Sequence, residues 1–192
     1  IMGGFFGTII AHLADKLYTK NPRYRPLIAA TCSFMQVLFF TIFLLLPIRL
    51  GITEKDIVAS VVMFFTILCS SILLQLAIVL FFFGMMFNSS IEPIKNSVIS
   101  DVNLPEQRAI VVSSISTIEL FFRSSGIAIA GLIIDITGNI RFTLILFVLL
   151  YIFAGNLWLR VVKHYPKDIK VTQERLKDRI ASTTNESQQK SF

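Results

Sequence analysis

The chain has 192 residues, of which 54% are hydrophobic and only 16% are charged, and its mean hydropathy is +0.72. A soluble domain does not reach these values, so the composition predicts an all-α, polytopic transmembrane helix bundle whose surface lies in a lipid bilayer. The formal net charge is +6. Because the basic residues lie at the ends of apolar runs, and not in a stripe interleaved with aromatic residues, the charge does not predict nucleic acid as a partner.

The first stretch, residues 1–14, is apolar but shorter than the roughly 20 residues that a membrane span needs. We therefore expect it to be the last part of a transmembrane helix, and the chain to be a fragment of a longer protein. Gly3, Gly4 and Gly7 have the small-residue spacing that favours close helix packing. Residues 15–26, which are rich in basic side chains, are predicted to form a cytoplasmic loop.

The sequence from residue 11 to residue 25, AHLADKLYTKNPRYR, resembles a loop of the major facilitator superfamily of transporters. That loop has the form Gly-x-Leu-Ala-Asp-Arg/Lys-x-Gly-Arg-Arg. Asp15 and Lys16 match its acidic and basic positions, whereas Ala11 and Thr19 replace its glycines. In the family this carboxylate ties helix ends across the two halves of the transporter. The resemblance therefore implies that the partner of Asp15 lies mostly in an N-terminal half outside this chain. The alternative is a solvated loop that caps a helix.

Residues 27–47 form a full predicted span, and residues 48–56 form a polar turn. The next stretch, residues 57–100, would be about 66 Å long as one helix, which is twice the thickness of a hydrocarbon core. It must hold either one crossing with an additional element or two crossings. The distribution of basic residues favours one crossing at about 72–100, with an extra helix on the outer face near 54–69.

With one crossing, most of the 18 Lys and Arg residues fall on one side of the membrane, in the loop at 16–25, near Arg108 and in the C-terminal tail. The positive-inside rule makes this side cytoplasmic. The sequence therefore predicts an integral, multi-pass protein of the cytoplasmic or plasma membrane, with a cytoplasmic C-terminus. The transmembrane bundle is expected to cover residues 27–165.

A second motif, DVNLPEQR, occupies residues 101–108. Asp101 is expected at the end of one helix, and Pro105 suits the first turn of the next. Followed by a Ser-rich apolar helix, the motif resembles the loop between the tenth and eleventh helices of the same superfamily. It is most similar to the spinster-like and related archaeal or bacterial branch, although the family's Arg-Gly is here Arg108-Ala109. The two motifs together imply part of the C-terminal six-helix half of the major facilitator fold. The loop residues to which the resemblance gives a role in conformational change are Asp15, Lys16, Asp101, Pro105 and Arg108.

Residues 105–134 are predicted to be a span that packs inside the bundle, because Ser, Thr, Gly and Ala are frequent in it. Residues 135–141 are expected to form an outer turn, and residues 142–162 the last span. Residues 166–181 form a basic amphipathic cytoplasmic segment that is expected on the anionic inner leaflet. Residues 182–192 are expected to be disordered.

Two charged residues, Glu119 and Arg123, are four positions apart and fall near the middle of the span at 105–134. Charges at this depth are costly and almost always face a cavity or a partner. One interpretation is a structural ion pair. The other is a cavity-lining pair that binds an anionic group or relays protons. Lys95 can pair with Glu92, which lies three positions before it. An isolated polar residue in a span is more often a helix–helix contact than a ligand contact. The other candidates for a substrate or proton pathway are Gln36, Gln75, Asn88 and Glu92.

The sequence has no motif for a nucleophilic serine, a phosphate-binding loop or a metal-binding cluster, so we expect no enzyme activity, no cofactor and no metal. The predicted function is secondary active transport of a small organic or amphiphilic solute by alternating access, carried out together with an N-terminal half of the same chain. The alternative is a small polytopic membrane scaffold or assembly subunit that has no transport activity of its own.

Overall fold

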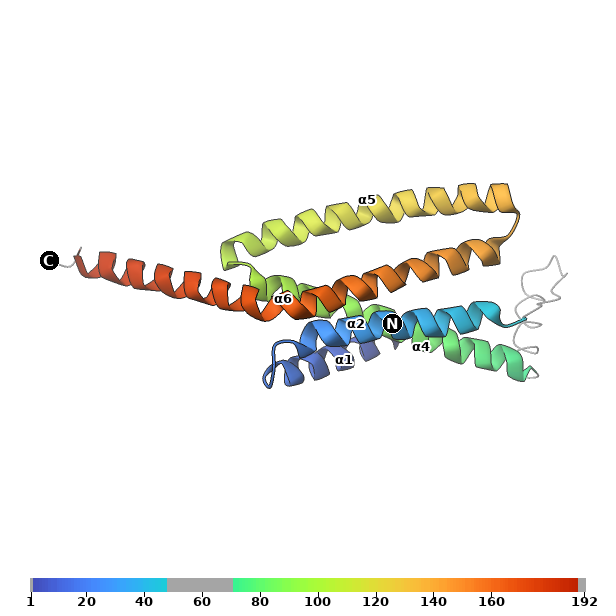
Figure 1. Ribbon diagram of the computed structural model, residues 1–192, viewed down its shortest axis with the longest axis horizontal. Coiled ribbons are helices and arrows are strands. Elements are labelled where there is room, and N and C mark those ends of the chain that lie inside the picture. The colour runs from blue at the N-terminus through green and yellow to red at the C-terminus, as the bar shows by residue number, and fades with distance from the viewer. Residues whose placement is uncertain (1, 48–70, 190–192) are drawn as a thin grey trace.

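The computed structural model describes residues 2–47 and 71–189, and this part of the chain is helical with no strand (Figure 1). The helices are α1 (Met2–Tyr18), α2 (Tyr24–Leu45), α4 (Ile72–Val102), α5 (Pro105–Thr137) and α6 (Ile140–Gln189). All but α1 are long and apolar enough to cross a membrane, which indicates a multi-pass membrane protein. The extra helix expected near 54–69 lies outside the described residues.

The helix ends follow from short-range signals in the sequence. The Ser71 hydroxyl accepts a hydrogen bond from the Leu74 backbone N–H at 3.4 Å, which caps the start of α4. Pro105 occupies the first turn of α5, where its missing N–H costs nothing. Gly138 ends α5 in the left-handed conformation, with φ of 64°, and the Asn139 side chain then accepts from the Phe142 N–H at 3.0 Å at the start of α6.

Two boundaries differ from those that the sequence predicts. The turn between α1 and α2 is shorter than the expected loop at 15–26, because α1 continues to Tyr18 and α2 begins at Tyr24. At the other end of the chain, α6 is one helix that continues through Pro166 and on to Gln189. It therefore includes most of the tail that composition alone predicts to be disordered. Figure 1 shows this last part of α6 projecting beyond the other helices.

Helix α4 is also continuous, although Pro93 lies inside it. Proline removes one intrahelical hydrogen bond and crowds the preceding turn. One turn before it, the hydroxyls of Ser89 and Ser90 donate to the Met86 carbonyl at 3.0 and 2.7 Å. These local bonds satisfy the two serine hydroxyls within the helix at membrane depth, whereas the carbonyl to which Pro93 cannot donate is that of Ser89.

The bundle is centred on α2, which packs against both α4 and α6, while α1 packs against α4 (Figure 1). The largest buried apolar cluster lies where these four helices approach the α1–α2 turn. It consists of Ala14, Ala29, Ile94, Val98, Tyr165 and Ile169. Towards the other end of α2, the Phe39 ring stacks on Phe83 and Phe87 of α4, with centroids 5.4 and 5.7 Å apart.

Helix α5 contributes no buried residue to this bundle. In Figure 1 it runs beside α6 with a visible separation over much of its length. The Ser-, Gly- and Ala-rich composition predicts a helix that packs inside a bundle, but among the described residues these small side chains have little cover. A helix of this composition has a surface suited to close packing against a further helix.

Candidate functional site

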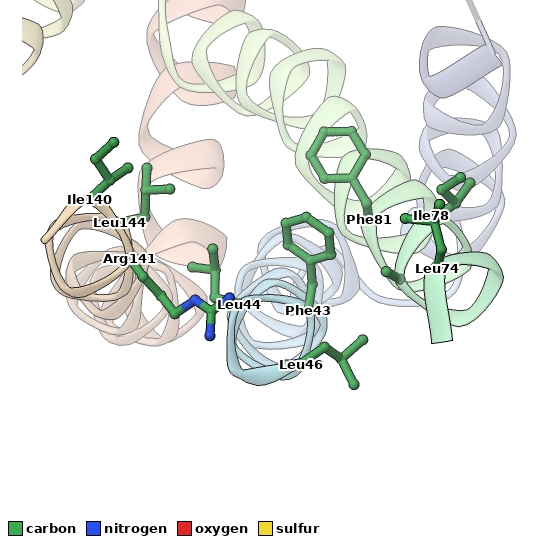
Figure 2. A pocket seen from close by; sticks show the side chains of 10 residues that line it. Phe43, Leu44, Leu46, Leu74, Ile78, Phe81, Ile140, Arg141 and Leu144 are labelled. Carbon is green, nitrogen blue, oxygen red and sulfur yellow. The ribbon is translucent and has the colours of Figure 1, made fainter. Parts of the chain in front are cut away.

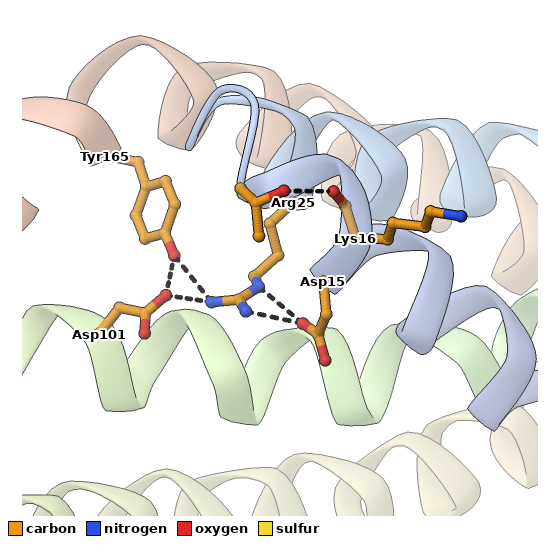
Figure 3. A network of polar contacts seen from close by, with 6 residues as sticks. Asp15, Lys16, Arg25, Asp101 and Tyr165 are labelled. Carbon is orange, nitrogen blue, oxygen red and sulfur yellow. Dashed lines mark hydrogen bonds and ion pairs between the residues drawn. The ribbon is translucent and has the colours of Figure 1, made fainter.

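The strongest polar cluster is centred on Arg25, near the start of α2. This arginine is only 8% exposed. Its Nε and Nη2 atoms donate to Asp15 Oδ1 of α1 at 3.1 and 2.7 Å, and its Nη1 atom donates to Asp101 Oδ2 of α4 (Figure 3). A guanidinium group has five donors in a fixed planar arrangement, so it can hold two carboxylates on different helices at the same time.

Two tyrosines complete this cluster. The Tyr165 hydroxyl of α6 donates to Asp101 Oδ2 and lies 3.5 Å from Arg25 Nη1, while its ring is 1% exposed within the apolar core. The Tyr18 ring lies on the guanidinium, with Arg25 Cζ 4.0 Å from the ring centroid, a cation–π contact. Burial, with a further contribution from Asp101, raises the pKa of the Tyr18 hydroxyl, which keeps this phenol neutral. The Arg25 cluster therefore joins α1, α2, α4 and α6 at one end of the bundle.

The Arg25 cluster corrects one expectation about the loop motifs. The resemblance implies a partner for Asp15 outside this chain, but Asp15 pairs with Arg25, ten positions later in the same chain. Asp101, from the second motif, meets the same guanidinium, so the cluster brings the two motifs together. Lys16 takes no part in it, and Figure 3 shows the Lys16 side chain extending away.

The other residues of the second motif organise the α4–α5 turn. Pro105 begins α5, and the Arg108 Nε donates to the Asn103 carbonyl at 3.3 Å. From α6, the Thr172 hydroxyl donates to the Val102 carbonyl at 3.0 Å. The turn is thus held by α6 as well as by its own residues, directly beside the Arg25 cluster.

A second cluster joins α4 to α5. The Lys95 Nζ atom lies 2.9 Å from Glu92 Oε2 and 2.6 Å from Glu119 Oε1, and the Lys95 side chain is 17% exposed. The contact between Lys95 and Glu92 agrees with their spacing of three positions. The partner of Glu119, however, is Lys95 and not Arg123, which is the partner that spacing along α5 indicates.

These charges line a cavity of about 370 Å³ between α4, α5 and α6. Arg123 belongs to the wall of this cavity and makes no ion pair within residues 2–47 and 71–189. Tyr151 of α6 and the apolar side chains of Ile91 and Phe122 also contribute to the wall. Four of the six residues predicted for a substrate or proton pathway meet here: Asn88, Glu92, Glu119 and Arg123.

The other two predicted pathway residues lie elsewhere. Gln36 of α2 is 2% exposed, and its side-chain oxygen has no hydrogen-bond partner among the described residues. Gln75 is an exposed residue near the start of α4. Neither glutamine lines the cavity that contains Arg123.

Sequence reasoning did not identify Arg25 or Tyr165 as site residues. Arg25 precedes the apolar run of α2, so the sequence alone suggests only a basic loop residue. Tyr165 follows the last apolar run, so the sequence alone suggests only an aromatic residue at the membrane interface. The available signal was the position of Arg25 immediately before Pro26, inside the first turn of a span, together with Asp15 in the first loop motif and Asp101 in the second.

Comparison with models of known families gives no match to this sequence, and neither the curated proteins nor the solved structures include one that matches it. The functional argument therefore depends on the geometry of the two clusters and on the two motifs.

Proposed function

We propose that this chain is part of the C-terminal six-helix half of a transporter of the major facilitator type, similar to the spinster-like branch. It would move a small organic or amphiphilic solute by secondary active, alternating-access transport. The observation that carries the proposal is the environment of Arg123, a cation that makes no ion pair with any described residue and lies in the wall of a cavity of about 370 Å³ at membrane depth.

The charge pattern supports a site for an anionic group. Lys95 is bound by both Glu92 and Glu119, so these carboxylates already have a cationic partner. Arg123 has none among the described residues, and it lies about 27 Å along the axis from the start of α5, near the middle of the bilayer. A guanidinium at this depth is stabilised by an anion that it can bind through two parallel hydrogen bonds. Ile91 and Phe122 offer contacts for the apolar part of the same solute.

The uncovered surface of α5 supports the presence of a second half. Alternating access in this superfamily requires two helical bundles that rock around a site near the bilayer midplane. The small side chains of α5 have little cover in this bundle, and they suit close packing against helices of an N-terminal half.

The Arg25 cluster supports a role for this bundle as one moving unit. It holds the ends of α1, α2 and α4 and the middle of α6 together, so these segments would move as a body when the two halves rock. In this proposal Asp15 and Asp101 stabilise the half itself. Lys16, Pro105 and Arg108 remain available for contacts that change between states.

The test is transport by the full-length protein in proteoliposomes, with a panel of radiolabelled organic anions and neutral analogues of the same size. We expect accumulation of one or more anions, and Arg123→Gln to abolish it while the protein remains folded. Arg160→Gln removes an exposed basic residue of α6 that does not line the cavity and is the matched control. If Arg123→Gln transports the same anions at the wild-type rate, Arg123 is not the binding group.

A second variant tests whether anion binding depends on Arg123 itself or on the neighbouring ion pair between Lys95 and Glu119. Lys95→Gln combined with Glu119→Gln removes one positive and one negative charge, so no new net charge is left in the cavity. We expect this double variant to fold and to keep anion binding at Arg123. If no member of the panel is transported under any gradient, the scaffold interpretation is favoured, with the exposed Leu176 and Ile180 on the projecting part of α6 as its contact surface.

A further inference from the structure

A separate cavity of about 570 Å³ lies at the opposite end of the bundle from the Arg25 cluster. It is formed between the end of α2, the start of α4 and the start of α6 (Figure 2). Most of its wall is apolar, and the main contributions are made by Phe43, Leu46, Leu74, Phe81 and Leu144. Its volume falls in the range of about 300–1,000 Å³ that is typical of ligand-binding pockets.

Arg141 is the one charged side chain among the described residues that line this cavity. It is the second residue of α6, and in Figure 2 its side chain extends from α6 towards Leu44 of α2. It makes no ion pair within the described part of the chain. Its position at the first turn of a membrane-spanning helix places the guanidinium at the level of lipid headgroups.

We propose that this cavity binds an anionic membrane lipid, with the lipid phosphate on Arg141 and one acyl chain along the apolar wall. Arginine is well suited to the phosphate because its planar group makes two parallel, charge-assisted hydrogen bonds. The wall contains no carboxylate among the described residues, so nothing there favours the ammonium group of a zwitterionic lipid. Selection of the headgroup charge is the property that distinguishes this site from the ordinary lipid shell.

The acyl chain alone cannot provide the selectivity. Lipid tails are as apolar as the side chains of Phe43 and Leu144, so exchanging one for the other gives no hydrophobic gain within a bilayer. The apolar wall sets the shape and depth of the site, and Arg141 sets which lipid occupies it. The competing occupant is the chain segment 48–70, which connects α2 to α4 in the sequence.

The experiment uses the full-length protein with a single tryptophan in the cavity wall. Residues 1–192 hold one tryptophan, Trp158, so Trp158→Phe combined with Phe81→Trp leaves their single indole in the cavity, and any tryptophan in the rest of the full-length protein is replaced by phenylalanine. Phe81 is 45% exposed and contacts the Phe40 and Phe43 rings, so an indole fits there as another aromatic group. The protein is placed in nanodiscs of phosphatidylcholine that contain a minor fraction of brominated phosphatidylglycerol or brominated phosphatidylcholine, with the same acyl chains.

We expect the brominated anionic lipid to reach the same quenching of this indole at a membrane fraction about tenfold lower than the brominated zwitterionic lipid needs. A factor of about ten in affinity corresponds to the contribution of one hydrogen bond to a charged group. Arg141→Gln should remove the difference, and Arg141→Lys should keep part of it. Phe153→Trp in the Trp158→Phe background is the control, because Phe153 is an exposed residue of α6 outside the cavity. There the two brominated lipids should quench equally, with or without Arg141.

Three results would overturn the proposal. Equal quenching of the Phe81→Trp indole by the two lipids would show no selection of headgroup charge. A preference that survives Arg141→Gln would place the selecting group elsewhere. Absence of quenching by either lipid, with normal quenching at the Phe153→Trp position, would show that no lipid enters the cavity.

Discussion

Arg25 and Asp101 are 76 positions apart in the sequence, yet the Arg25 guanidinium donates to the Asp101 carboxylate in a largely buried contact between α2 and α4. The same guanidinium also holds Asp15 of α1, and the same carboxylate accepts from Tyr165 of α6. Two ion pairs of one arginine and one tyrosine hydrogen bond thus link four helices. Breaking a buried pair by removing one partner is costly, because the remaining charge loses its compensation.

The first prediction concerns the order of stability losses in the Arg25 cluster. Arg25→Gln should destabilise the protein by about 3 kcal/mol, because two carboxylates lose their cation. Asp101→Asn should cost less, since the Arg25–Asp15 pair remains. Asp15→Asn should cost below about 1 kcal/mol, because the Asp15 side chain is 52% exposed and water already screens its charge.

This order is measured as the free energy of unfolding in titrations with sodium dodecyl sulfate. Lys20→Gln removes an exposed basic residue from the neighbouring turn and serves as the control, with no expected change. An Arg25→Gln variant that is as stable as the Lys20→Gln control would contradict the importance of the cluster.

The second prediction concerns the closest approach of α1 to α4. A Cβ added at Gly7 would lie 2.9 Å from the Ser89 backbone oxygen, and this oxygen cannot move without shifting α4. Gly7→Ala should therefore cost about 1–3 kcal/mol in unfolding free energy, as is usual for overpacking. Thr8→Ala, at the next position on an exposed face of α1, should be close to neutral. Equal stability of the two variants would show that the helices separate easily at Gly7.

The third prediction concerns the partner of Glu119. A double-mutant cycle with Lys95→Gln and Glu119→Gln should give a coupling energy of about 0.5 kcal/mol or more, because the two groups are 2.6 Å apart. The equivalent cycle with Glu119→Gln and Arg123→Gln should give a coupling energy near zero. Both cycles are measured on unfolding in the same detergent. A larger coupling in the second cycle would mean that Glu119 exchanges Lys95 for Arg123 in solution.

The fourth prediction concerns the orientation of the bundle in the membrane. The α1–α2 turn, the α4–α5 turn and the projecting part of α6 lie at the same end of the structure, and this end carries most of the basic residues (Figure 1). A cysteine introduced at Asn21 should be protected from an impermeant thiol reagent in intact cells, and one at Asn139 should react. Cys32→Ser and Cys69→Ser remove the cysteines of residues 1–192, and any cysteine in the rest of the full-length protein is replaced in the same way. Labelling at Asn21 alone would invert the topology.

The sequence by itself determined several ends of the membrane helices. The predicted span at 72–100 is close to the observed α4, Ile72–Val102, and the proline and glycine signals at Pro105 and Gly138 coincide with the two ends of α5. These features depend on short-range effects: hydrophobic length against bilayer thickness, a missing N–H in proline, and the left-handed conformation that glycine adopts easily. The same local effects did not reveal that α6 continues to Gln189.

Only the tertiary structure decided which charges meet. Spacing along α5 places Arg123 beside Glu119, but the rotation of α5 against α4 brings Lys95 to that carboxylate. The resemblance to a known loop places the partner of Asp15 in another half, but the crossing of α1, α2 and α4 brings Arg25 between Asp15 and Asp101. The physical reason is that an ion pair depends on distances of a few ångströms between side chains of different helices. These distances are set by helix rotation and crossing, which the packing of small and aromatic side chains across the whole bundle decides.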